Sequence, residues 1–230
     1  VFSGCLLLIS IIVDSENKTF DSRENCNAIV ETATNTLIAG CKNTVIPNSV
    51  TSIKESAFTD TGIIDITIPN SVMKIGNSAF SDCDLKSIKL SDNITSIERY
   101  SFGRCYHLTS ITIPDKVTSI GSQAFYYCES LKSIVIPNEV TSVGSSAFDK
   151  CSSLNSVCFI SKDVTIEYGA FPKNDNMQIL APKDSSVYNT LKEDYNVIPY
   201  SFTVNKDDKD KPMLALDGKV VLTEDMWSCI

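Results

Sequence analysis

Residues 111–134 read ITIPDKVTSIGSQAFYYCESLKSI, and this stretch decides the fold because its pattern recurs along the chain. The pair Ala124-Phe125 within it has five counterparts: Ala57-Phe58, Ala79-Phe80, Ser101-Phe102, Ala147-Phe148 and Ala170-Phe171. Successive phenylalanines are 22 residues apart up to Phe102 and 23 residues apart after it. A constant period of roughly 20 to 50 residues indicates a stack of repeated units.

Each unit also contains a Leu-x-x-Ile-x-Ile run, such as Leu131, Ile134 and Ile136, and a Val-x-x-Ile pair, such as Val117 and Ile120. The run alternates between apolar and polar residues, which is typical of a strand with one buried face. A proline follows most runs and ends the strand, because its nitrogen has no proton to donate. One unit cannot bury these side chains alone, so the pattern predicts stacked units with parallel strands.

The full pattern, Ile-Pro-x-x-Val-x-x-Ile-x-x-x-Ala-Phe-x-x-Cys-x-x-Leu-x-x-Ile, runs from Ile113 to Ile134. It resembles the BspA-like leucine-rich repeats, and the resemblance covers residues 1–182. It implies an α/β-type repeat solenoid that is rich in β-structure, with one parallel sheet of 22–23-residue repeats and few helices. Many members of this family are surface adhesins of bacteria and of unicellular parasites. The resemblance therefore implies an extracellular or cell-surface protein.

Cysteine occurs repeatedly in one slot, three residues after the phenylalanine. The cysteines in this slot are Cys5, Cys83, Cys105, Cys128 and Cys151. They lie on different rungs and His107 is the only histidine, so the pattern argues against a zinc site and favours a ladder of buried thiols. Any Ser-His-Asp or Cys-His arrangement would also need His107. We therefore expect no catalytic site, no metal and no cofactor.

The composition limits the partners of this chain. A net charge of -8 argues against nucleic acid, whose binding proteins usually carry a basic stripe, and against general attraction to an anionic membrane. The apolar run 6–13 is too short to span a bilayer, so we expect no membrane insertion in this segment. We expect a monomer.

Both ends depart from the regular repeat. The start fits the repeat register better than a signal peptide, so we expect residue 1 to lie inside a repeat, with signal and anchor outside this chain. Residues 14–47 predict an expanded repeat that carries a hairpin. Residues 183–200 predict a helical C-terminal cap over the open end of the solenoid, begun by Asp184 or Ser185. Residues 201–230 predict a charged linker with a tail or the start of another module.

Two surfaces are candidates for binding. The first is the outward face of the Leu-x-x-Ile-x-Ile strands, which comprises Asp65, Thr67, Lys86, Ser87, Lys89, Thr109, Ser110, Thr112, Lys132, Ser133, Val135, Asn155 and Ser156. The second is a rim in the turns that lead into these strands, with Tyr106, His107, Tyr126 and Tyr127. Binding hot spots usually contain Trp, Tyr or Arg, and the face contains none of these. The face is therefore either a weak binding surface or only a solvated side of the scaffold.

Three functions fit these observations, and we rank them in this order. The first is a non-enzymatic surface or secreted protein that binds an unknown protein or glycan ligand through the sheet face and rims. The second is a passive spacer in a larger cell-surface protein. The third is an enzyme whose catalytic module lies outside this chain.

Overall fold

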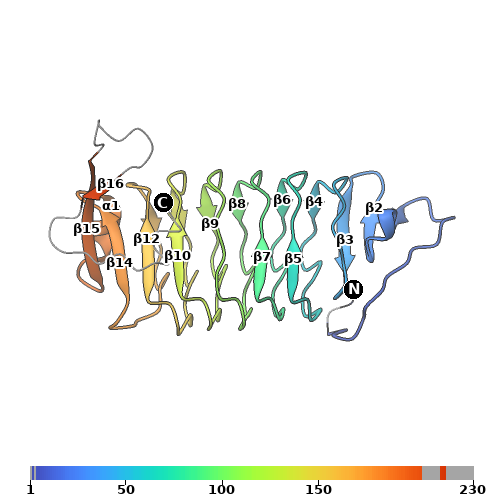
Figure 1. The fold of residues 1–230 in the computed structure, drawn as a ribbon, viewed down its shortest axis with the longest axis horizontal. Coiled ribbons are helices and arrows are strands. Elements are labelled where there is room, and N and C mark those ends of the chain that lie inside the picture. The colour runs from blue at the N-terminus through green and yellow to red at the C-terminus, as the bar shows by residue number, and fades with distance from the viewer. Residues whose placement is uncertain (1, 3, 204–212, 216–230) are drawn as a thin grey trace.

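The computed structural model describes residues 2, 4–203 and 213–215, and it shows a solenoid of stacked rungs (Figure 1). Along the long axis of Figure 1, the rungs follow one another from β3 (Thr36–Gly40) to β15 (Asn196–Thr203). Parallel strands of neighbouring rungs pair with each other, and helix is scarce. The predicted β-rich repeat solenoid is therefore confirmed.

The Leu-x-x-Ile-x-Ile runs form the first parallel ladder. Its strands are β5 (Asp65–Thr67), β7 (Ser87–Lys89), β10 (Ser133–Ile136), β12 (Ser156–Phe159), β14 (Gln178–Pro182) and β15. The ladder is interrupted between β7 and β10. There the N–H of Thr109 is held 3.5 Å from the oxygen of Lys86, and the N–H of Lys132 lies 3.4 Å from the oxygen of Thr109. These long contacts leave that rung without a regular strand.

The Val-x-x-Ile segments form a second parallel ladder on the other side of the core. Its strands are β4 (Ser52–Ile53), β6 (Lys74–Ile75), β8 (Ser96–Ile97), β9 (Ser119–Ile120), β11 (Ser142–Val143) and β13 (Thr165–Ile166). The prediction of one parallel sheet was therefore incomplete. Each of these strands has two residues, which is too short for an alternating pattern to reveal it.

The core between the two ladders contains a stack of phenyl rings. Neighbouring rings from Phe58 to Phe171 have centroids 4.8 to 5.7 Å apart and are tilted by at most 12°. Gly40 occupies the slot that a phenylalanine fills in the later rungs. Its N–H donates to the backbone oxygen of Ala57, just as the N–H of Phe58 donates to the backbone oxygen of Ala79. A Cβ atom at Gly40 would lie 2.0 Å from the ring of Phe58. The stack therefore begins on a glycine.

Each corner from Phe58 to Phe148 is flanked by two residues in the left-handed backbone region. Gln123 and Tyr127, with φ of 58° and 59°, flank the corner at Phe125. The same two slots hold Ser56, Asp60, Ser78, Asp82, Tyr100, Arg104, Ser146 and Lys150 in the other rungs. Such a conformation costs roughly 1–2 kcal/mol for a residue other than glycine. Hydrogen bonds between corners, such as the 2.8 Å bond from Phe125 N–H to Ala147, hold it in place.

The expanded region near the start contains short strands and a hairpin. Its elements are β1 (Phe20–Asp21), η1 (Arg23–Asn25), β2 (Ala28–Glu31) and β3. Strands β2 and β3 pair antiparallel, with a bulge between Ile29 and Val30, and β3 then pairs in parallel with β4. The hairpin therefore lies where the β-prone runs predicted it, and its second strand joins the solenoid.

Residues 4–13 stack on the next rung but leave one side uncovered. The N–H of Gly4 donates to Asp60 and the N–H of Lys42 donates to Leu8, each at 3.2 Å. Cys5, which we expected in the buried ladder, is exposed instead. Among the described residues, residues 4–13 contact a neighbouring rung on one side only, and Leu7 is 90% exposed.

The helix near the end of the chain, α1 (Ser186–Leu191), is shorter than predicted. Ser185 caps it by accepting the N–H of Tyr188, and its Val187 and Leu191 are buried. The helix packs against β13, β14 and β15, and β15 continues the first ladder. The capping role of this helix stays a prediction. Strand β16 (Met213–Ala215) pairs antiparallel with β15. The predicted linker and tail, apart from β16, lie in 204–212 and 216–230, outside the described residues.

Candidate functional site

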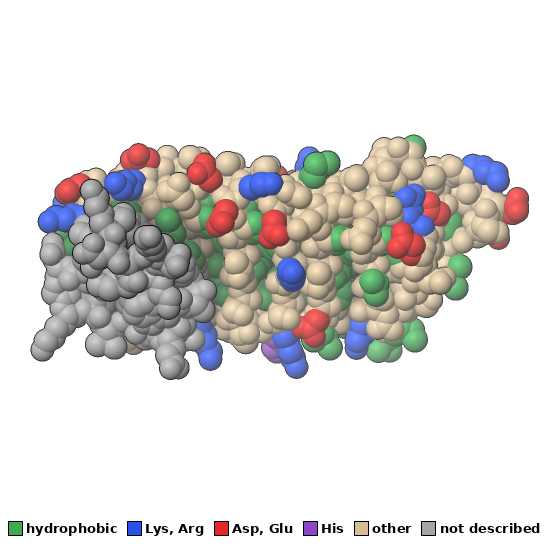
Figure 2. Space-filling model, turned by 45° about the horizontal axis from the view of Figure 1, so that its top comes forward, with side chains coloured by type: hydrophobic (Ala, Val, Ile, Leu, Met, Phe, Trp, Pro, Cys, Tyr) green, Lys and Arg blue, Asp and Glu red, His purple; other side chains and the backbone are tan. Residues whose placement is uncertain are grey.

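The predicted binding face lies on the outward side of the first ladder. Ser133, Val135 and Ser156 are half-buried, and the other members of the predicted face are exposed. Ser87 donates a 2.6 Å hydrogen bond to Asp65 across two rungs. Figure 2 shows positive and negative side chains intermixed over the described part of the surface in that view, without a large region of one sign. The binding role of this face stays a prediction.

Four tyrosines gather at consecutive corners beside this face, and with Arg104 they form what we call the tyrosine rim: Tyr100, Arg104, Tyr106, Tyr126 and Tyr127. The rings of Tyr126 and Tyr127 meet edge to face with centroids 4.6 Å apart. Tyr106 lies 6.3 Å from Tyr127, and Tyr100 lies 6.3 Å from Tyr126. All four side chains are half-buried, so their stems are fixed while part of each ring meets solvent. His107, the remaining predicted rim residue, is exposed.

Arg104 organises one end of the rim. Its Nε atom donates to the hydroxyl of Tyr106 at 2.8 Å and lies 3.1 Å from a carboxylate oxygen of Asp82. Because Arg104 is 49% exposed, this ion pair orients the side chain more than it stabilises the fold. Burial raises the pKa of Asp82. Burial, aided by the charge of Asp82, raises the pKa of Tyr100, which therefore stays a neutral phenol.

The sequence pointed to Tyr106, Tyr126 and Tyr127 but missed Arg104 and Tyr100 as members of the same cluster. Arg104 and Tyr100 occupy the two left-handed slots of one corner, and the φ angles of these slots are 61° and 57°. A repeat alignment places both slots beside the following tyrosines. The sequence therefore contained the information that groups these residues. It did not indicate the left-handed backbone, because neither residue is a glycine.

Four of the five predicted ladder cysteines are buried, and each donates its thiol to the phenylalanine oxygen of the preceding rung. The sulfur-to-oxygen distances are 3.0 to 3.2 Å for Cys83, Cys105, Cys128 and Cys151. Burial raises the pKa of Cys83 and of Cys151 to about 12. Only a thiolate is a strong nucleophile or metal ligand, so these thiols serve packing.

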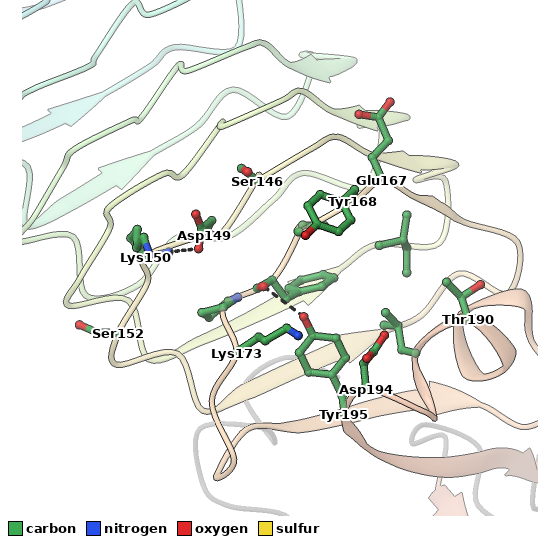
Figure 3. Close-up of a pocket in the computed structure, with 16 residues that line it drawn as sticks. Ser146, Asp149, Lys150, Ser152, Glu167, Tyr168, Lys173, Thr190, Asp194 and Tyr195 are labelled. Carbon is green, nitrogen blue, oxygen red and sulfur yellow. Dashed lines mark hydrogen bonds between the residues drawn. The ribbon is translucent and has the colours of Figure 1, made fainter.

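A groove that the sequence did not reveal lies beyond the last Ala-Phe corner (Figure 3). We call it the corner groove; its volume is about 730 Å³, and it lies between residues 146–152, 166–173 and 190–195. Tyr168 stands at its mouth with a side chain that is 95% exposed. Tyr195 projects from the opposite wall in Figure 3, and its hydroxyl donates to the oxygen of Phe171 at 3.1 Å. In four earlier rungs, those of Phe58, Phe80, Phe102 and Phe125, a ladder cysteine makes that contact.

Within the described part of the chain, no group of three or more His, Cys, Asp or Glu side chains is arranged to hold a metal ion. None of the described helices has the length and apolar character needed to cross a bilayer.

Comparison with protein families identifies the repeats. The model of the BspA type leucine rich repeat region matches in six copies, over residues 36–154 and 95–187. These ranges together cover more than half of the chain, so the protein belongs to the BspA-type leucine-rich-repeat family. No curated protein sequence matches the chain.

Solved structures agree with this assignment. A leucine rich cell surface protein from Faecalibacterium prausnitzii A2-165 is 34% identical, with a TM-score of 0.62, over 69% of this chain and 44% of that one. The pneumococcal vaccine antigen PcpA is 19% identical, with a TM-score of 0.71, over 85% of this chain and 51% of that one. The second likeness shows the fold alone. The chain thus spans about half the length of these two structures.

Proposed function

We propose that this chain is a non-enzymatic binding module of a secreted or cell-surface protein, and that it recognises a protein or glycan partner through the tyrosine rim and the adjoining sheet face. Its family and its likeness to a bacterial leucine rich cell surface protein support the location. The repeat fold, whose rungs are rigidly stacked, supports binding rather than catalysis.

The tyrosine rim is the observation that carries this proposal. Tyrosine and arginine are over-represented in binding hot spots, since each offers a large contact area together with a polar tip. Here the hydroxyl of Tyr106 is already fixed by Arg104 at 2.8 Å, and the rings of Tyr126 and Tyr127 support each other. These side chains would therefore lose little conformational entropy when a partner binds.

A binding screen of residues 1–230 against extracellular-matrix proteins, mucins and cell surfaces tests the proposal. A Tyr106→Ser, Tyr127→Ser variant removes the rim, and a Lys86→Glu, Thr109→Glu, Lys132→Glu variant alters the sheet face. Lys74→Glu, an exposed change on β6 in the other ladder, is the control. Circular dichroism establishes that all variants fold.

Saturable binding that the rim variant loses, and the control retains, supports recognition through the rim. Loss of binding in the sheet-face variant alone would move the site to the face. Absence of binding by the parent to the whole panel contradicts the proposal and favours a passive spacer. The spacer is the second candidate because the rungs repeat so uniformly, with phenyl rings tilted by at most 12°.

A further inference from the structure

The corner groove contains backbone donors that every interior corner uses. In the preceding rung the N–H of Ser146 donates to the backbone oxygen of Tyr168 at 3.3 Å, and the N–H of Phe148 donates to the backbone oxygen of Ala170 at 2.7 Å. The equivalent groups in the last corner are the N–H groups of Gly169 and Phe171. Neither has a hydrogen-bond partner among the residues that the structure describes. Unpaired donors beside a buried ring favour the arrival of an oxygen acceptor.

The groove also offers an aromatic face and an apolar floor. The ring of Tyr168 is almost fully exposed, and the view in Figure 3 places it across the groove from Tyr195. Buried Phe171 and Leu191 and half-buried Ile166 lie between them. The face of an aromatic ring is weakly negative and attracts the slightly positive C–H bonds of a flat ligand. A ligand with one C–H face and many oxygens matches both features.

The charges around the groove nearly cancel. Its lining contains Asp149, Glu167 and Asp194 against Lys150 and Lys173. A polyanion such as a sulfated glycan or a nucleic acid would need an excess of positive charge, which this lining does not have. Carboxylates accept hydrogen bonds and amines donate them, so together they suit hydroxyl groups, which do both.

We propose that the corner groove binds a neutral oligosaccharide. Its pyranose rings stack on Tyr168, and its hydroxyl oxygens accept the N–H groups of Gly169 and Phe171. The volume of about 730 Å³ falls within the usual range for small-ligand sites. This site is separate from the tyrosine rim and does not depend on the function proposed for it.

A peptide that completed the ladder is the main competitor for the same donors. To follow the corner it would need residues in the left-handed region, as Ser146 and Lys150 are in the preceding rung. That conformation costs roughly 1–2 kcal/mol for each residue other than glycine. A pyranose ring is rigid before it binds and has no such cost. The geometry therefore favours the sugar.

Nuclear magnetic resonance of the full 230-residue chain tests this site. The probes are oligomers of two to four units of glucose, galactose, mannose or N-acetylglucosamine. At least one is expected to shift the amide resonances of Gly169 and Phe171 saturably and to slow their exchange with solvent. Tyr168→Ser is expected to weaken that binding at least about tenfold, since stacking residues act as hot spots. Met73→Ser, which alters an apolar side chain that is 61% exposed outside the groove, should bind like the parent.

The two proposals fail separately. A Tyr106→Ser, Tyr127→Ser variant should keep full affinity for the oligosaccharide, whatever it does to partners of the rim. The sugar site is refuted if no oligomer moves the two amides, or if Tyr168→Ser binds as tightly as the parent. It is equally refuted if heparin or an Ala-Phe peptide, and no neutral sugar, moves them.

Discussion

Cys105 and Cys5 occupy the same slot of the repeat, but Cys105 is buried and Cys5 is exposed. The difference lies in the number of neighbouring rungs. Cys105 has a rung on each side and donates its thiol to Phe80 at 3.1 Å. In the part of the chain that the structure describes, residues 4–13 contact a rung on one side only. The repeat pattern thus specifies where a side chain points, whereas burial requires a neighbour on both sides.

The sharpest test of this comparison removes a phenyl ring from the middle of the stack and another from the first residues of the chain, outside the stack. Phe102 lies between rings at 5.7 and 5.5 Å, whereas Phe2 is half-buried. Phe102→Ala should lower the free energy of unfolding by about 3–5 kcal/mol, since it leaves a cavity. Phe2→Ala should cost less than about 1 kcal/mol. Urea unfolding followed by circular dichroism measures both, and similar losses would contradict the comparison.

A second test adds atoms at the point where the stack begins. Gly40→Ala places a Cβ atom 2.0 Å from the ring of Phe58, so it should lower the free energy of unfolding by about 1–3 kcal/mol. In a Phe58→Leu background the smaller side chain leaves room, and the same change should cost less. A double-mutant cycle in urea measures this coupling. Additive losses would show that the two residues do not interact.

A third test uses pH. Burial raises the pKa of Cys83 and Cys151 to about 12 in the folded chain, against 9.0 for a free thiol. Above pH 9 the unfolded chain releases these protons and the folded chain keeps them. Stability is therefore unaffected below pH 9 and falls as pH rises, by about 1.4 kcal/mol per pH unit for each thiol.

Urea unfolding between pH 9 and pH 11 measures this slope. A Cys83→Ala, Cys151→Ala variant is expected to start less stable but to lose stability less steeply with pH, because two titrating groups are gone. Cys5→Ala, at an exposed cysteine outside the buried ladder, is the control. An equal slope in the parent and the double variant would contradict the burial of the ladder.

The smallest expected effect concerns the corners. Gln123 has a φ of 58°, and the last corner has a glycine, Gly169, in the same slot. Gln123→Gly should therefore raise the free energy of unfolding by up to about 1 kcal/mol, as relief of strain exceeds the entropy lost. Ser122→Gly, one residue earlier, has no such strain to relieve and should be destabilising. Thermal unfolding of the two variants compares them, and a loss in both would argue against strain.

The regular part of the fold could be predicted because its signal is repeated. The phase of Phe58, Phe80 and the following phenylalanines placed the core, the first ladder and the outward face. The second ladder was not predicted because strands of two residues show no alternation of apolar and polar residues. The backbone at the corners escaped notice because residues such as Gln123 and Arg104 rarely adopt positive φ.

The corner groove could not be predicted for a different reason. Tyr168 belongs to a repeat, but Tyr195 follows a helix that replaces a strand in the last rung. Only the packing of α1 beside β13 brings the two rings to one groove. The tyrosine rim stands between these cases, since three of its tyrosines were predicted from the sequence but the contact of Arg104 with Asp82 crosses rungs.

The corners tolerate steps of 22 and of 23 residues between successive phenylalanines, and this has a consequence for evolution. A rung meets only the rung before and the rung after it, so a duplicated or deleted unit leaves every remaining contact of the same kind. Lineages can therefore lengthen or shorten the solenoid by recombination without redesigning its core. Each inserted unit would shift the corner groove along the axis by about 4.8 Å. The reach of a binding site thus becomes a trait that selection can adjust in small equal steps.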